Sequence, residues 1–306
     1  MPTVSVIIPN YNHSRYLKQR IDSVLNQTYS DYEVIILDDH STDNSKDIIE
    51  RYRNNPKIAH IIYNPKNSGS TFKQWRKGVT LANGEYIWIA ESDDWAEKSF
   101  LETLIPKFSV SEKINLVFSN SYIIDSENKI IGKGSQYITT SKFDWEEDLI
   151  ITDKNDFAIS ICESIFIYNA SAVIIKKKAI KDNTIDPSLR LTGDTKTFIN
   201  LGLDGDIYYD SQCLNHFRKH INNVRTKSSS SGYDNLEFLK LFIYLFNKIT
   251  DPDVKEIVFN KISYYFKLSW VKRSDIGITK AITALMIALY KTPQLATLVF
   301  KKIIND

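Results

Sequence analysis

The first hundred residues alternate between short runs of β-branched and aliphatic residues and longer stretches with helical periodicity. The runs begin at residues 4, 33, 58 and 85, a spacing close to the roughly 30 residues of a strand–helix–strand unit. Nearly every position in a run is apolar, which is typical of strands buried on both faces of a parallel sheet. The pattern therefore predicts four parallel strands at residues 4–8, 33–37, 58–62 and 85–90.

The segments between these runs carry helix signals. Ser14 is the expected N-cap of a first helix, and Ser41 or Thr42 of a second, because short hydroxyl side chains accept hydrogen bonds from free backbone N–H groups. The apolar face of the first helix is formed by Leu17, Ile21, Val24 and Leu25. Right-handed crossovers place the loops after the strands at one edge of the sheet, where open α/β sheets bind ligands.

A polar cluster follows each of the four predicted strands. The clusters are Pro9-Asn10-Tyr11-Asn12, Asp38-Asp39-His40-Ser41, residues 64–69, and Glu91-Ser92-Asp93-Asp94. All four are expected to meet at the ligand-binding edge of the sheet.

The last of these clusters brings three carboxylates together at a strand end. Their mutual repulsion calls for a compensating cation, and Mg²⁺ or Mn²⁺ binds one or two carboxylates together with substrate phosphates. The alternative is that Asp93 or Asp94 caps the helix that follows. The pair Asp38-Asp39 has two readings as well: it accepts hydrogen bonds from a ribose or base, or it forms a turn.

Beyond residue 95 the pattern is less regular. We expect a strand at 115–119, a hairpin at 122–131, a long surface excursion at 132–156, a strand at 171–178 and a helix at 195–203. The low-complexity stretch 226–232 predicts a linker at 226–233, which separates an α/β domain at 1–225 from a helical region at 234–306. Helices are predicted there at 234–249, 254–272 and 279–304.

Composition excludes several classes of protein. With 42% hydrophobic and 25% charged residues the chain is an ordinary globular protein, and a net charge of +2 gives no reason to expect a nucleic-acid partner. Cys162 and Cys213 lie far apart in the sequence and have no neighbouring Cys/His clusters, so neither a disulfide framework nor a zinc site is expected. The N-terminus lacks a signal-peptide pattern, which favours the cytoplasm, and the apolar stretch at 281–300 is interrupted by Pro293.

The motifs of the first hundred residues resemble family 2 of the inverting glycosyltransferases, which have the GT-A fold. The resemblance lies in Pro9-Asn10-Tyr11-Asn12, Asp38-Asp39-His40-Ser41-Thr42-Asp43, Asn67-Ser68-Gly69, Gly84-Glu85-Tyr86-Ile87 and Glu91-Ser92-Asp93-Asp94, in the family's order and spacing. The resemblance implies an enzyme that uses a metal-bound nucleoside diphosphate sugar, with UDP as the expected nucleotide.

The resemblance also implies roles for individual residues. Pro9, Tyr11 and Asp39 would hold the nucleotide base, Asp93 would approach the ribose or diphosphate, and Asp94 would ligate Mg²⁺ or Mn²⁺.

The chain departs from the family pattern in two places. Glu91 stands where the family often has aspartate, so it keeps the charge expected of a metal ligand but reaches farther. Trp75-Arg76 replaces the family's Arg-Asn, which leaves Lys73 or Arg76 to supply a cation near the base or phosphates.

The second half of the predicted domain offers a general base. Family members carry this carboxylate at the start of a helix, and Asp194 before Thr195 is similar, although aspartate is also an ordinary helix cap. An Arg-x-His element of the family, which closes over the diphosphate, corresponds to Arg218 and His220, with His220 as a further metal ligand. The alternative for this stretch is a basic surface strand.

The sequence therefore predicts transfer of a sugar from a nucleotide donor to a glycan or lipid-linked hydroxyl acceptor. A sugar-nucleotide nucleotidyltransferase would need a glycine-rich phosphate loop after the first strand, and PNYN has no glycine. A non-catalytic sugar-nucleotide or glycan-binding module remains the other reading. The C-terminal helices would dock on the first domain, form dimers, or lie on the inner membrane face through residues 276–304 with their basic flanks.

Overall fold

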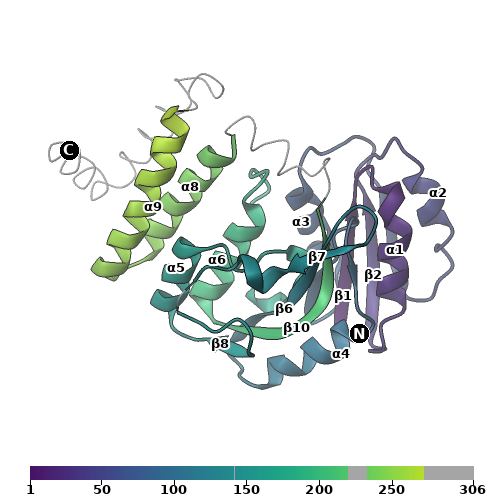
Figure 1. Cartoon of the computed structure of the whole chain (residues 1–306). Coiled ribbons are helices and arrows are strands. Elements are labelled where there is room, and N and C mark those ends of the chain that lie inside the picture. Colours follow the sequence, from purple (N-terminus) through teal and green to yellow (C-terminus); the bar gives the residue numbers. More distant parts are fainter. Residues whose placement is uncertain (141, 220–232, 272–306) are drawn as a thin grey trace. The chain divides into compact units, whose positions relative to one another are not determined.

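The structure is a computed structural model that describes residues 1–140, 142–219 and 233–271 (Figure 1). The chain forms two compact units, one of residues 1–160 and 164–220 and one of residues 161–163 and 221–306. The linker predicted at 226–233 lies almost wholly outside the described residues, and the helix predicted at 279–304 lies outside them entirely. The domain boundary therefore stays a prediction.

The first unit is built on one mixed sheet. The four predicted strands are confirmed as β1 (Val4–Asn10), β2 (Tyr32–Asp38), β3 (Ile58–Tyr63) and β4 (Tyr86–Ile89), all parallel where they pair. The order β3-β2-β1-β4 continues into β9 (Val173–Lys176), β6 (Ile114–Ile124), β10 (Asp206–Arg218) and β5 (Trp95–Ala96). Two short strands lie off this path: β7 (Ile130–Lys133) pairs with β6, and β8 (Leu149–Ile151) with β10.

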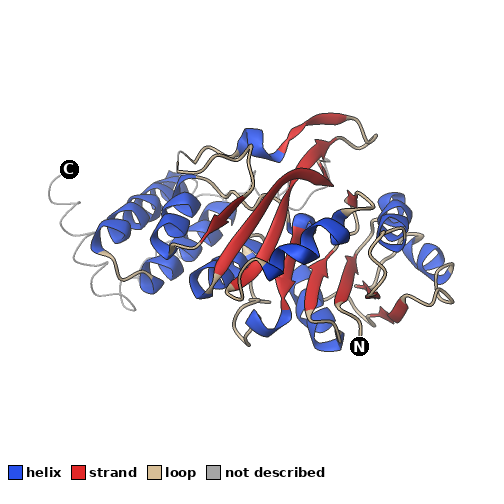
Figure 2. Cartoon of the chain, turned by 90° about the horizontal axis from the view of Figure 1, so that it is seen from below, coloured by secondary structure: helices blue, strands red, loops and turns tan. Residues whose placement is uncertain are grey.

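Helices cover both faces of this sheet, as the apolar runs predict (Figure 2). One face packs against α1 (Ser14–Leu25), α2 (Ser45–Glu50) and α4 (Phe100–Leu104), and the other carries α3 (Thr71–Leu81) and α6 (Gly193–Asp204). In β1 the side chains of Val4, Val6 and Ile8 belong to the α1 core, while Ile7 points the other way, towards α3. A Cβ at Gly78 of α3 would lie 2.5 Å from Ile7 Cγ2, so only glycine permits this close approach.

The remaining described elements are shorter or flank the sheet. They are α5 (Lys154–Glu163) and the 3₁₀ helices η1 (Ile105–Ser109), η2 (Gly134–Tyr137), η3 (Ala170–Ala172) and η4 (Lys177–Ala179).

The predicted N-caps of the first two helices are wrong. The N-cap of α1 is His13, and Ser14 N donates 2.9 Å to Asp43 Oδ2. The other oxygen of Asp43 accepts from Ser45 N, at 3.0 Å, where α2 begins. One carboxylate thus accepts hydrogen bonds at the start of both helices, through its two oxygens. The sequence had instead predicted a separate hydroxyl cap for each helix.

In the second half, the hairpin, the strand near 171–178 and the helix near 195–203 are confirmed as β6–β7, β9 and α6. The surface excursion predicted at 132–156 is wrong in part, because β8 pairs with β10 and Trp145 is buried against Phe166 and Tyr209. The 13-residue strand β10 was not predicted over its full length, since polar residues interrupt its apolar pattern.

The second unit contains α8 (Tyr233–Lys248) and α9 (Pro252–Val271), close to the predicted ranges. The Tyr265 ring stacks on Phe238 and Phe242, with centroid distances of 5.0 and 5.5 Å, so these aromatic residues join the two helices. Among the described helices, none is long and apolar enough to cross a membrane.

Candidate active site

The topology brings the predicted site residues to one edge of the sheet. β9 is antiparallel to both β4 and β6, and β10 is parallel to β6, so β6 and β10 run in the same direction as β1 to β4. Arg218 therefore ends β10 at the edge where β4 leads into Glu91–Asp94. The helix α6 immediately precedes β10, so its N-terminus with Asp194 lies at this edge too.

The loops after β1 and β2 are tied together by buried polar groups. Asn10 Nδ2 donates to Asp38 Oδ2, at 2.8 Å, and to Ser41 Oγ, at 3.1 Å. Asp38 in turn accepts from Ser41 N at 2.9 Å. Beside this network Pro9 is buried and Tyr11 is 46% exposed, so the Tyr11 ring is accessible to a ligand.

Asp39 organises the loop after β3. It is 5% exposed, and its carboxylate accepts from Asn64 Nδ2 at 2.6 Å, from Ser68 N at 3.0 Å and from Gln74 Nε2 at 2.9 Å. Lys73 is exposed at the start of α3, and its Nζ donates to Ser68 O at 2.8 Å. The described contacts of Asp39 are structural, and its predicted role towards a nucleotide base stays a prediction.

The acidic signature lies against a cluster of buried groups. Asp94 is 2% exposed, and its Oδ1 accepts from Arg218 N at 2.8 Å. Ser92 is buried, with its Oγ 2.8 Å from His13 Nδ1. Glu91 Oε1 accepts from the indole of Trp75 at 2.7 Å.

Burial, together with the neighbouring carboxyl group, changes the proton affinity of Glu91 and Asp94. Burial raises the pKa of Glu91 to about 8, and the neighbouring Asp93 adds to this. Burial likewise raises the pKa of Asp94 to about 6, again with a contribution from Asp93. A bound cation would reverse both effects, because it favours the ionised form of each carboxyl group.

A buried guanidinium lies next to these carboxylates. Arg20 of α1 is 0% exposed, its Nε donates to Glu91 O at 2.8 Å, and it lies over the Trp88 ring. Burial lowers the pKa of Arg20 to about 10, while Asp94, Asp93 and Glu91 act in the opposite direction.

Arg218 connects the signature with the β6–β7 turn. Its Nε donates to Asp93 O at 2.8 Å, its Nη1 to Asp125 O at 3.0 Å, and its Nη2 to Asn128 Oδ1 at 2.7 Å. The guanidinium is thus engaged by the protein on every side, and contact with a diphosphate stays a prediction. His220, the other member of the predicted pair, lies outside the described residues.

The candidate base begins α6. Asp194 is half-buried in the first turn, and its Oδ1 accepts from Thr195 N at 2.6 Å. The preceding Gly193 rests against α3, where an added Cβ would lie 2.5 Å from the Phe72 ring. Phe72 and Trp75 meet edge to face at 5.1 Å, so the two aromatic residues of α3 lie between Gly193 and Glu91.

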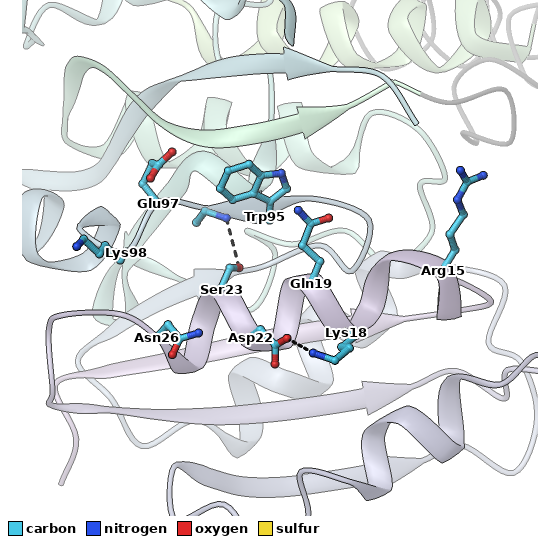
Figure 3. A pocket seen from close by; sticks show the side chains of 10 residues that line it. Arg15, Lys18, Gln19, Asp22, Ser23, Asn26, Trp95, Glu97 and Lys98 are labelled. Atoms are coloured by element: carbon cyan, nitrogen blue, oxygen red, sulfur yellow. Dashed lines mark hydrogen bonds and ion pairs between the residues drawn. The ribbon is translucent and has the colours of Figure 1, made fainter. Parts of the chain in front are cut away.

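A groove of about 590 Å³ runs beside the signature, between α1 and the segment that begins at Trp95 (Figure 3). Gln19 and Ser23 line its α1 side, and Trp95 and Glu97 the other. The Trp95 ring stacks on His216, with 3.4 Å between centroids. None of the three signature carboxylates lines this groove, so we do not assign the donor nucleotide to it.

Sequence reasoning missed Arg20, Trp75 and Ser171 as parts of the site. One signal was present for Arg20: with Leu17 and Val24 it falls within the buried stripe of α1, and a charged residue there needs polar surroundings. For Trp75 the only signal was its departure from the family pattern, and its contact with Glu91, 16 positions further along the chain, depends on how α3 packs. For Ser171 the sequence carried no signal, because it lies 80 positions from Glu91.

Comparison with known proteins agrees with this architecture. The family described as "Glycosyl transferase family 2" matches residues 5–180. Chondroitin synthase of Escherichia coli is 28% identical over 267 residues, which are 86% of this chain and 34% of that protein. The matched stretches span less than half of the curated relatives first found, between 34% and 46% of their length.

Two solved structures share the fold. Staphylococcus aureus TarS 1–349 in complex with UDP-GlcNAc has a TM-score of 0.65 and 19% identity, with 94% of this chain and 80% of that chain covered. The mannosyltransferase PcManGT of Pyrobaculum calidifontis in complex with GDP-Man and Mn²⁺ has a TM-score of 0.58 and 13% identity, with 99% and 80% covered.

The sheet order, the helices on both faces and the acidic signature at the carboxyl edge define an α/β fold of the GT-A type, which confirms the predicted fold class. The chain belongs to glycosyl transferase family 2.

Proposed function

We propose that this chain transfers a sugar from a nucleoside diphosphate donor, most simply a UDP-sugar, to a hydroxyl group of a surface glycan, with inversion at the anomeric carbon. The observation that carries the proposal is the buried Asp94 at the carboxyl edge of the sheet, with its raised pKa and with Asp194 at the same edge. Family membership and the complexes of the two structural relatives with UDP-GlcNAc and with GDP-Man support a nucleoside diphosphate sugar as donor, and the first of them suggests UDP.

A divalent cation, Mg²⁺ or Mn²⁺, fits the chemistry of the signature. In the described part of the chain, no three His, Cys, Asp or Glu side chains form a ready-made metal cage. A hard cation such as Mg²⁺ does not need such a cage, because it takes one or two carboxylates and completes its shell with substrate phosphates. Asp94 would hold the ion, with His220 as a further ligand, and Asp93 would approach the ribose or diphosphate. The positive charge of the ion would stabilise the departing diphosphate.

The residues of the chain would divide the remaining work. The loops with Pro9, Tyr11 and Asp39 would receive the nucleotide base. Asp194 would accept the proton of the acceptor hydroxyl as its oxygen attacks the anomeric carbon. The bond from that carbon to the diphosphate breaks on the opposite side, and its electron pair leaves with the diphosphate, so the configuration inverts.

The proposal extends to the acceptor of the sugar and to the location of the protein. Similarity to chondroitin synthase favours a growing polysaccharide, and a lipid-linked glycan would present the same hydroxyl chemistry. The proposal includes peripheral membrane contact through residues 276–304, which lie outside the described residues.

The test is calorimetric binding of UDP and GDP with and without Mn²⁺, on the parent chain and on Asp94→Asn. We expect UDP to bind in a Mn²⁺-dependent manner and Asp94→Asn to weaken this binding by at least about tenfold, because the amide removes one negative ligand charge. Asp204→Asn, an exposed aspartate at the far end of α6, is the matched control. If neither nucleotide binds under any metal condition, the donor site is wrong.

A further inference from the structure

Glu91 is fixed by contacts along its whole length. Its Oε1 accepts from Trp75 Nε1 at 2.7 Å, and its N donates to Ser171 Oγ at 3.1 Å. Its carbonyl oxygen accepts from Arg20 Nε at 2.8 Å and from Asp94 N at 3.3 Å. Side chain and backbone of the first signature residue are thus both engaged by the protein.

The partners come from three separate elements. Trp75 belongs to α3 on one face of the sheet, Arg20 to α1 on the other, and Ser171 to η3 next to β9. Trp75 is 1% exposed, and Arg20 and Ser171 are 0% exposed, so none of them can move without disturbing the core. The start of the turn that carries Asp93 and Asp94 is therefore anchored to both helical layers.

We propose that Glu91 is a positioning residue and not a metal ligand. The Trp75 indole holds the Glu91 side chain, and Glu91 in turn fixes the conformation of the turn that carries Asp93 and Asp94. The inference rests on the proposed function and refines its metal site. It replaces the ligand role that the sequence suggested for Glu91.

The length of the side chain explains why glutamate stands here. Trp75 is held in place by Phe72, whose ring meets it edge to face at 5.1 Å, so the indole N–H is at a fixed position. Glutamate reaches it, glutamine would reach it with the same acceptor oxygen, and aspartate is shorter by one methylene. Positioning therefore requires the length of the side chain, whereas metal ligation requires its charge.

This contrast gives a test in which the two roles predict opposite orders. The dissociation constant of Mn²⁺ is measured in the presence of UDP for the parent, Glu91→Gln, Glu91→Asp and Trp75→Phe. We expect Glu91→Gln to remain within about threefold of the parent, and Glu91→Asp and Trp75→Phe to bind about 10- to 100-fold more weakly, as is typical when a group that supports a metal ligand is removed. Trp145→Phe is the control, since this buried indole donates to Thr140 Oγ1, away from the signature.

The opposite order overturns the inference: if Glu91→Asp binds Mn²⁺ like the parent while Glu91→Gln loses as much affinity as Asp94→Asn, Glu91 is a ligand. A second measurement needs no metal. The urea midpoints of unfolding should be unchanged or higher in Glu91→Gln and lower in Glu91→Asp and Trp75→Phe. The double variant Glu91→Asp/Trp75→Phe should be no less stable than the less stable of its two single variants, since both substitutions remove the same contact.

Additive losses in the double variant would overturn the anchor even if metal binding follows the expected order. If the parent chain binds no Mn²⁺ in the presence of UDP, the proposed function is contradicted. The urea midpoints of unfolding would still show whether Trp75 holds the Glu91 side chain.

Discussion

At the scale of single residues, Asp194 carries the chemical step of the proposal. Its carboxylate is half-buried in the first turn of α6, at the edge that also holds Asp94. The contact with Thr195 N fixes one oxygen and orients the group. A base in this position needs only hydrogen-bond reach to the acceptor hydroxyl.

Asp194→Asn should bind UDP and Mn²⁺ like the parent and lose transfer by about 10²- to 10⁴-fold in kcat, because the amide cannot accept the proton. Binding is followed by calorimetry and transfer by release of UDP from a UDP-sugar in the presence of acceptor. Asp204→Asn should change neither quantity. Unaltered turnover in Asp194→Asn would assign the base to another residue.

At the scale of elements, α3 connects the two halves of the candidate site. Trp75 holds Glu91 of the signature, and Phe72 packs against Gly193 at the start of α6. Close approach of α3 to the sheet depends on Gly78, which rests on Ile7. A small shift of this helix would therefore change the signature and the candidate base together.

Gly193→Ala tests this coupling. The added Cβ would lie 2.5 Å from two atoms of the Phe72 ring, and overpacking of this kind costs about 1–3 kcal/mol in the free energy of unfolding. Adding Phe72→Leu should restore part of that loss. Gly132→Ala, whose Cβ would meet nothing closer than 3.2 Å, is the control. Thermal unfolding of the parent and these three variants measures the effect, and a neutral Gly193→Ala would show that α6 is free to shift.

At the scale of the whole molecule, the signature makes folding stability depend on pH. Between the ordinary value of 4.5 and the raised pKa of about 8, Glu91 is protonated in the folded chain and ionised in the unfolded chain. The folded state then binds more protons, so this contribution to stability is complete below pH 4.5 and is lost as the pH rises towards 8.

Without metal, the free energy of unfolding of the parent should therefore fall between pH 5 and 8 relative to that of Glu91→Gln. The slope of the difference should approach about 1.4 kcal/mol per pH unit, the value for one proton. Urea unfolding at several pH values gives both curves. Parallel curves would mean that Glu91 is ionised in the folded chain.

Much of the fold was determined by local sequence. The strands β1 to β4 were predicted because each is an apolar run between helical segments, and such runs are formed by neighbouring residues. The position of Asp94 after β4 followed from the same reasoning, since a parallel sheet aligns the ends of its strands. The family resemblance added Asp194 and Arg218 from motif and order.

Only the tertiary structure decided how these residues are held. Asp43 accepts from a backbone N–H at the start of each of two helices, Arg218 is engaged by the β6–β7 turn, and Glu91 is anchored by Trp75 and Arg20. β10 becomes a long strand through pairing with β6, although its polar residues interrupt the pattern. Local patterns fix elements because they depend on neighbours in the chain, whereas hydrogen bonds between residues 16 to 124 positions apart depend on packing that no single segment encodes.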